Sequence, residues 1–388
     1  EEVVAPPYDV LNTAEARVRA EGRPNSFLHI SKPEIDLPEG TDPYDPSVYA
    51  KGAENLQRLI DDGVLMREEK PCYYIYRLRW EGHLQTGLVF GASVAAYDIN
   101  RVRKHEFTRP VKEDDRVRQI TALKAQTGPV LLTYRADDAV KAIIDETAAG
   151  TPVYDLTADD GIGHTLWVLD DDAKIEQLNQ IFDATDALYI ADGHHRSASA
   201  SRVAKENSAE SAQYFLSVAF AHDEMKILDY NRVVRDLHGL SADELLANAA
   251  ASFDLELSAE AVRPAKPTQF GMYVNGQWYR LDVHEELVPS DDPVASLDVS
   301  LLHSNLIEPL LGISDPRRDD RIDFVGGMRG LGELEKRVDS GEMAVAFSLY
   351  PTTMEALMDV ADANEVMPPK STWFEPKLAD GLVSHVLD

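Results

Sequence analysis

One stretch of this chain reads Leu188-Tyr189-Ile190-Ala191-Asp192-Gly193-His194-His195-Arg196-Ser197. Its apolar first half predicts a buried strand, Asp192-Gly193 predicts a turn, and the residues that follow, through Ala204, predict a helix. A strand that ends at a glycine turn and continues into a helix directs several backbone N–H groups at one point, next to the positive end of the helix dipole. The junction therefore predicts a site for phosphate or another anion.

The side chains of this junction strengthen the functional interpretation. A structural interpretation is open, in which Asp192 caps the helix, Gly193 forms the turn and Arg196 pairs with a nearby acid. However, a carboxylate, two imidazoles and a guanidinium lie within five consecutive positions, including His194 and His195. This density of reactive groups favours a functional site.

Composition limits the class of protein. A chain of 388 residues predicts two lobes or one core with large insertions. The net charge of −30 and the pI near 4.6 argue against a general nucleic-acid or anionic-membrane binder. The single cysteine, Cys72, excludes an internal disulfide. No signal peptide or membrane-spanning segment is visible in the sequence, so we expect a cytoplasmic location and leave the oligomeric state open.

The order of predicted elements indicates an α+β (mixed α/β) fold. Hairpins are predicted for residues 73–80 with 84–94, and for 272–274 with 278–283 around Asn275-Gly276. A strand is expected at 26–30, and helices at 44–63 and 113–126. The pattern of predicted strands and helices changes near residue 240. We therefore expect a phosphate-binding core with N-terminal elements and an insertion at 1–240, a second, smaller α+β lobe at 241–345, and a C-terminal strand, helix and docked tail that complete the site at 346–388.

A second cluster contains His105, Glu106 and Thr108. A glutamate beside a histidine can act as a general base or hold a divalent cation, although such a pair is often only a surface or capping feature. Basic residues surround the cluster in a chain that is otherwise acidic, namely Arg101, Arg103, Lys104, Arg109 and Lys112. This local reversal of charge favours an anionic ligand.

A third cluster lies in the proline-braced tail, which contains Lys370, Ser371 and Lys377. The glycines of a P-loop are missing upstream, so that motif is rejected, but a lysine from a docked tail could reach a phosphate. Arg232 could contribute another anion contact, or it could be a solvated arginine on a plain strand.

The sequence lacks the motifs that zinc hydrolases, serine hydrolases and dinucleotide-binding enzymes require. No helical His-Glu-x-x-His, Gly-x-Ser-x-Gly or Gly-x-Gly-x-x-Gly motif is present. Phosphoryl transfer needs only a phosphate cradle, a cation and a base, which the three clusters can supply.

Four ordered motifs resemble the bacterial and archaeal family called "domain of unknown function 1015". They are Ala5-Pro6-Pro7-Tyr8-Asp9-Val10, His105-Glu106-Phe107-Thr108, Ala191-Asp192-Gly193-His194-His195-Arg196 and Pro369-Lys370-Ser371-Thr372-Trp373-Phe374-Glu375-Pro376-Lys377. The resemblance covers nearly the whole chain.

The second and third of these motifs are also similar, more distantly, to the free-serine kinases of the ParB/sulfiredoxin-like superfamily. That resemblance implies a ParB/sulfiredoxin-like core with large insertions. It implies Glu106 as the catalytic base, with His105 beside it, and Asp192 as a catalytic or Mg²⁺-binding carboxylate. The phosphate-binding residues that we predict from all clusters are Gly193, His194, His195, Arg196, Thr108, Lys370, Ser371, Lys377 and Arg232.

We therefore expect a nucleotide-dependent kinase that transfers a phosphoryl group from ATP or ADP, with Mg²⁺, to a hydroxylated metabolite, with free serine as one candidate. Its partners would be nucleotide and small-molecule substrate. Two alternatives stay open: a nucleotide or phosphate-ester hydrolase that uses the same cradle, and a non-catalytic protein that senses nucleotide or binds a partner.

Overall fold

The computed structural model describes residues 2–388 and divides into two compact units. The first unit extends to Met225 and also includes Pro376–Asp388, so both ends of the chain belong to it. The second unit is Lys226–Glu375. The three segments that the sequence predicts, with boundaries near residues 240 and 345, remain a prediction. Among the described residues, no helix is long and apolar enough to cross a membrane.

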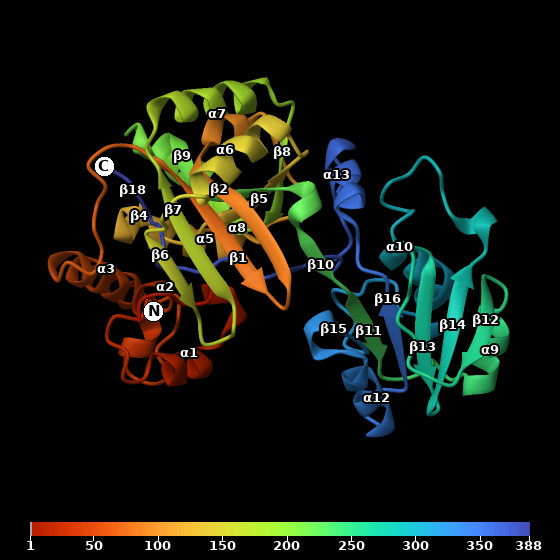
Figure 1. The fold of residues 1–388 in the computed structure, drawn as a ribbon. Coiled ribbons are helices and arrows are strands. Elements are labelled where there is room, and N and C mark those ends of the chain that lie inside the picture. Colours follow the sequence, from red (N-terminus) through yellow and green to blue (C-terminus); the bar gives the residue numbers. More distant parts are fainter. Residues whose placement is uncertain (1) are drawn as a thin grey trace. The chain divides into compact units, whose positions relative to one another are not determined.

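The first unit is built on an eight-stranded sheet in the order β3-β8-β5-β9-β2-β1-β7-β6 (Figure 1). Its strands are β1 Tyr73–Trp80, β2 His83–Ser93, β3 Val102–Arg103, β5 Val130–Tyr134, β6 Tyr154–Thr157, β7 Gly163–Leu169, β8 Leu188–Asp192 and β9 Tyr214–Ala221. A separate pair joins β4 Ala125–Gln126 to β18 His385–Val386. The C-terminal segment is therefore tied into the first unit by backbone pairing.

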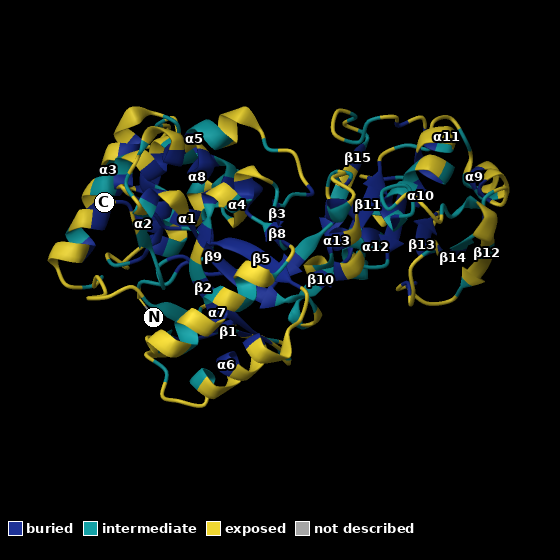
Figure 2. Cartoon of the chain, turned by 90° about the horizontal axis from the view of Figure 1, so that it is seen from above, coloured by how far each residue is buried: buried dark blue, intermediate teal, exposed yellow. Residues whose placement is uncertain are grey.

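The helices of the first unit are α1 Thr13–Ala20, α2 Leu28–Ser31, α3 Pro46–Asp61, α4 Val94–Asp98, α5 Pro110–Leu123, α6 Asp138–Ala148, α7 Asp172–Ala184 and α8 His194–Glu206. Figure 2 shows buried residues concentrated in β5 and β9, while the outer surfaces of α6 and α7 are exposed. Apolar side chains of α6, α7 and α8 belong to one core cluster with the central strands. This core holds β8 and the start of α8 in a fixed relation.

The second unit contains a six-stranded antiparallel sheet in the order β12-β14-β13-β16-β11-β15 and a short pair, β10 with β17. Its strands are β10 Lys226–Leu228, β11 Tyr230–Val234, β12 Phe253–Ser258, β13 Gln269–Val274, β14 Gln277–Val283, β15 Ile322–Gly326, β16 Val345–Leu349 and β17 Trp373–Glu375. Its helices are α9 Ala242–Ala249, α10 Asp298–Leu302, α11 Glu308–Leu311, α12 Leu331–Asp339 and α13 Met354–Asp362, with a π-helical segment, His303–Ile307, between α10 and α11. The mixed α+β class expected from the sequence is confirmed.

Both predicted hairpins are confirmed, and their turns explain why. Glu81 and Gly82 have φ of 47° and 80°, and Asn275 and Gly276 have φ of 50° and 75°. Two consecutive left-handed residues form the turn type that matches the twist of paired strands.

The strand expected at 26–30 is wrong, because this segment forms α2. Its apolar residues pack with α1 and α3 in a small core of the N-terminal segment and pair with no strand. The helix expected at 113–126 begins earlier, at Pro110, and ends at Leu123, where Lys124 adopts a left-handed conformation with φ of 50°. A proline is favoured in the first helical turn because its missing N–H is not needed there.

Candidate functional site

The strand, turn and helix predicted around Asp192 are confirmed as β8, Gly193 and α8. Gly193 has φ of 98°, which L side chains rarely adopt. A Cβ at this position would also lie 3.1 Å from Nε of Arg196 and 3.4 Å from Cα of Val130. Among the described residues, no side chain caps the N-terminus of α8. The turn therefore requires glycine, and the first N–H groups of α8 are available to an anion.

Asp192 lies between two cations. Its Oδ2 is 3.2 Å from Nζ of Lys377, which comes from the C-terminal segment, and its Oδ1 is 3.9 Å from Nη2 of Arg196. Burial by itself would raise the pKa of the Asp192 carboxyl, but Lys377 and Arg196 outweigh burial and hold this pKa below its usual range. The carboxylate is therefore ionised at neutral pH, and Lys377 belongs to the turn, as the sequence predicts for a docked tail residue.

Arg196 is held from several directions. Its Nη1 donates to the carbonyl oxygen of Pro129, and its Nη2 is 3.8 Å from Oδ2 of Asp9, near the N-terminus. The side chain is only 11% exposed. Burial opposes the charge of the guanidinium, but Asp9 and Asp192 raise the pKa of Arg196 above its ordinary value. Arg196 is therefore a fixed, fully charged donor directly behind the turn.

His194 connects the turn to the loop that carries Glu106. The backbone N–H of His105 donates to Nε2 of His194 at 3.3 Å, so the neutral His194 ring carries its proton on Nδ1. This Nδ1 lies 3.6 Å from Oε2 of Glu106, whose side chain is 62% exposed. Burial and the neighbouring His105 ring hold the pKa of His194 well below its ordinary value, so the ring stays neutral. Glu106 is therefore accessible to a substrate while its direction is set by His194.

His105 itself is buried, at 3% exposure. Its ring stacks edge-on against His194 with centroids 4.5 Å apart, and a hydrogen bond connects it to the Ile190 backbone. Burial lowers the pKa of His105 to about 4. Within residues 2–388, Nδ1 of His105 is one of the few buried polar atoms without a hydrogen-bond partner. The geometry thus places His105 behind the exposed carboxylate, where it supports the loop.

His195 anchors the other end of the same loop. The backbone N–H of Arg109 donates to its Nε2 at 3.0 Å, which leaves Nδ1–H as the remaining donor of the neutral ring. The hydroxyl of Thr108 donates to Oε1 of Glu113, in the first turn of α5. The two adjacent histidines therefore diverge and hold two separate N–H groups of one loop. This use of their rings is a feature that sequence reasoning missed.

Several of the basic side chains near Glu106 have structural partners. Arg101 donates to the carbonyl oxygens of Phe182, Asp183 and Thr185 at the end of α7. Lys104 donates to the carbonyl oxygen of Tyr97. The local excess of positive charge that the sequence shows is thus partly used to support the scaffold.

The remaining predicted anion contacts belong to the second unit. Arg232 is buried, and its Nη1 and Nη2 donate to the carbonyl oxygens of Tyr230 and Lys370. The hydroxyl of Ser371 donates to the carbonyl oxygen of Pro368 at 2.6 Å. Arg232 and Lys370 therefore lie together, and their role in phosphate binding stays a prediction.

Mg²⁺ is the metal that the sequence leads us to expect. Among residues 2–388, no three His, Cys, Asp or Glu side chains are grouped so as to hold a metal ion. Mg²⁺ that arrives with a nucleotide needs only one or two protein carboxylates, since phosphate oxygens and water complete its shell. The ionised Asp192 carboxylate fits that limited requirement.

Comparison with solved structures gives three distant likenesses. A conserved hypothetical protein from Pyrococcus furiosus is 14% identical with a TM-score of 0.36, over 76% of this chain and 93% of its own. A free serine kinase variant in complex with AMP is 13% identical with a TM-score of 0.38, over 76% of this chain and 92% of its own. SbnI with a C-terminal truncation, from Staphylococcus aureus, is 12% identical with a TM-score of 0.40, over 75% and 85%.

No curated protein matches the sequence. A profile of the family described as "Protein of unknown function (DUF1015)" matches residues 1–300, a region that contains three of the four motifs quoted above. The chain therefore belongs to the DUF1015 family.

Proposed function

We propose that this protein is a nucleotide-dependent kinase that phosphorylates a small hydroxylated metabolite. The observation that carries the proposal is the uncapped N-terminus of α8 after the left-handed Gly193, with the buried Arg196 and the Lys377 ammonium beside it. Backbone N–H groups, a helix dipole and two fixed cations together form a cradle for phosphate. The Nδ1–H of His195 would add a donor to these phosphates, while His194, whose Nδ1 faces Glu106, would act through that carboxylate.

Glu106 would act as the general base. Its carboxylate is 62% exposed, so an acceptor hydroxyl can reach it, and His194 lies 3.6 Å away. In the transfer step the hydroxyl oxygen attacks the terminal phosphorus of the nucleotide, and Glu106 takes the hydroxyl proton. The bond from that phosphorus to the bridging oxygen breaks, and the shortened nucleotide leaves with the electron pair.

Asp192 would hold Mg²⁺ together with the nucleotide phosphates. Bound Mg²⁺ neutralises charge on the phosphate oxygens. Asp192 also orients Lys377, and Arg196 fixes the phosphates from the buried side of the turn.

The test is a phosphorus NMR time course of the purified protein with Mg²⁺ and either ATP or ADP. It is run with and without a pool of hydroxyl-bearing metabolites that includes serine. We expect a new phosphate-monoester signal that depends on the acceptor. Free phosphate without an acceptor would instead indicate the hydrolase, and nucleotide binding without turnover would indicate the sensor.

The variant Glu106→Gln sharpens this test, because it keeps the size of the side chain and removes its basicity. We expect it to reduce the transfer rate by roughly 100-fold or more while nucleotide affinity changes little. The matched control is Glu69→Gln, which alters an exposed glutamate in the same unit. A Glu106→Gln protein with normal turnover would contradict the assignment of the base.

A further inference from the structure

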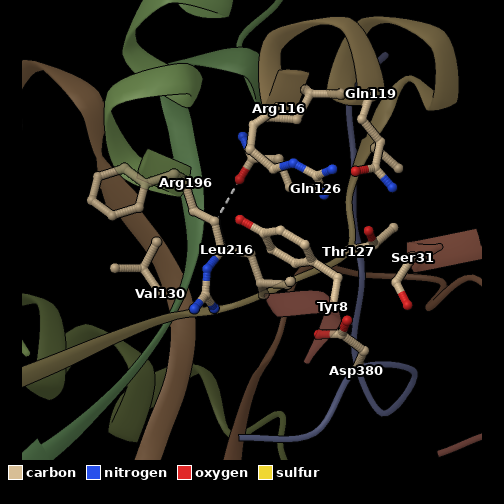
Figure 3. A pocket seen from close by; sticks show the side chains of 14 residues that line it. Tyr8, Ser31, Arg116, Gln119, Gln126, Thr127, Val130, Arg196, Leu216 and Asp380 are labelled. Atoms are coloured by element: carbon tan, nitrogen blue, oxygen red, sulfur yellow. Dashed lines mark hydrogen bonds between the residues drawn. The ribbon is translucent and has the colours of Figure 1, made fainter. Parts of the chain in front are cut away.

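A small cavity lies behind Arg196, inside the first unit. Its volume is about 30 Å³. A single water needs roughly 10–15 Å³ by this measure, so the cavity has room for about two. Figure 3 shows polar side chains facing this space from separate parts of the chain, namely Tyr8, Arg116, Gln119, Arg196 and Asp380.

Among the described residues, one acceptor that lines this cavity lacks a protein partner, and a buried carboxyl lines it as well. The side-chain N–H of Gln119 donates to the carbonyl oxygen of Ile30 at 3.0 Å, which turns Oε1 of Gln119 away from that carbonyl. Within residues 2–388, no donor reaches this buried Oε1. Asp380, whose carboxyl also lines the cavity, is 2% exposed. Buried polar groups of this kind are normally satisfied by internal water.

The backbone fixes the position of Asp380. Its N–H donates to the carbonyl oxygen of Ala5 at 2.9 Å, and the Ala5 N–H donates to the Asp380 carbonyl oxygen at 3.1 Å. This bridge ties the two ends of the chain together. Backbone pairing therefore places Asp380 at the cavity that Arg196 also lines.

Charged and titratable groups face Asp380 from four elements. They are Arg196 on α8, Arg116 on α5, Tyr8 and Asp9 in the 3₁₀ turn Tyr8–Val10, and Tyr76 on β1. Burial raises the pKa of Asp380 to about 8, Arg196 and Arg116 lower it, and Asp9 raises it. The carboxyl is therefore neutral at pH 7 and can donate to a cavity water.

We propose that binding of a phosphate group at the turn drives proton uptake by the Asp380 carboxyl. The proposal rests on the phosphate site of the proposed function. Arg196 connects the turn to the cavity, because it lies near Asp192 at the turn and also lines the cavity with Asp380. A phosphate that engages Arg196 adds negative charge near Asp380, so the ionised form of Asp380 becomes less stable and takes up a proton.

The experiment is calorimetric titration of the full chain with ADP between pH 7 and 9.5, in two buffers with different ionisation enthalpies. The difference in heat between the buffers gives the number of protons taken up. A rise of one unit in the pKa of Asp380 corresponds to a maximum of about 0.5 proton per ADP near pH 8.5 and much less at pH 7.

The key variant is Asp380→Asn, which keeps the shape of the side chain and its ability to donate and accept hydrogen bonds. We expect it to bind ADP at pH 7 within a few-fold of the wild type but to lose this proton uptake. The matched control is Asp9→Asn, which removes a different carboxylate beside Arg196. Uptake should persist in that control, with its maximum at lower pH, because Asp9 raises the pKa of Asp380.

Equal proton uptake by Asp380→Asn and the wild type, with ADP bound, would overturn this inference and leave the phosphate site intact. Failure of the wild type to bind either ADP or inorganic phosphate would instead overturn the proposed function and the linkage with it. Carbon NMR of the Asp380 carboxyl tests its electrostatic coupling to Arg196 without any ligand. Its titration midpoint should rise in Arg196→Gln, and an unchanged midpoint would overturn the coupling of the two residues.

Discussion

Arg196 contacts more of the site than any other side chain at the turn, since it reaches the Pro129 carbonyl, Asp9 and Asp192. A hydrogen bond to a charged group contributes about 1.5–3 kcal/mol, so Arg196→Ala should weaken ADP binding roughly 10- to 150-fold. The control is Arg23→Ala, which removes an exposed arginine that pairs with Asp159. Equal affinity of the two variants, measured by calorimetry, would exclude Arg196 from the phosphate site.

A second prediction for a single residue concerns Gly193. A Cβ there combines a left-handed φ with a 3.1 Å approach to the Arg196 guanidinium. Gly193→Ala should therefore cost about 1–2 kcal/mol of stability and also displace Arg196, with weaker ADP binding. Gly128→Ala is the control, because its Cβ would meet Cδ of Arg196 at an ordinary 3.5 Å and its φ is not left-handed. Thermal unfolding and ADP titration of both variants check the prediction.

At the scale of elements, the local pattern of the sequence predicted the turn between β8 and α8 and both hairpins. These elements depend on glycine turns and apolar runs that are read within about ten residues. The ring partners of His194 and His195 could not be predicted in this way, because they are backbone N–H groups of a loop far away in sequence. The strand expected at 26–30 failed for the same reason, since packing of the N-terminal helices decides that segment.

The C-terminal segment is the element that completes the turn. It pairs as β18 with β4 and brings Lys377 to Asp192. Lys377→Met should raise the pKa of Asp192, because the ammonium lowers it, and should weaken ADP binding roughly tenfold. Lys370→Met gives the comparison from the second unit. A larger loss of affinity in Lys370→Met than in Lys377→Met would contradict the assignment of Lys377 to the phosphate site.

For the whole molecule, buried histidines predict a loss of stability in acid. Burial lowers the pKa of His105 and His164 to about 4 and holds that of His194 well below its ordinary value. Their pKa in the unfolded chain is about 6.5, so below this pH the unfolded state binds protons that the folded state does not. The melting temperature should therefore fall as the pH decreases from 6.5 toward 4.5. The comparison is His164→Gln, because the buried Asp298 and Asp380 carboxyls, whose pKa values are raised to about 7 and about 8, oppose this fall in both proteins. An equal fall in the variant and the wild type would contradict the neutral, buried state of His164.

The turn brings two cations together in a chain whose net charge is strongly negative. The chain carries −30, yet Arg196 and Lys377 lie together at the turn. Composition argued against a general binder of nucleic acid, and the local motifs pointed to an anionic ligand. The contribution of Asp9 and Asp380 could not be read from composition or local pattern, because pairing of segments far apart in the sequence brings Asp9 to Arg196 and Asp380 to the cavity that Arg196 lines.

The central claim is that the N-terminus of α8 binds phosphate. The most direct measurement is a two-dimensional ¹H–¹⁵N NMR titration of the deuterated protein with ADP, followed at the backbone amides of residues 193–196. The account predicts the largest, saturating shifts at these amides, with smaller shifts at residues 105–109. Saturable binding of ADP without shifts at residues 193–196, or no binding at all, would contradict it.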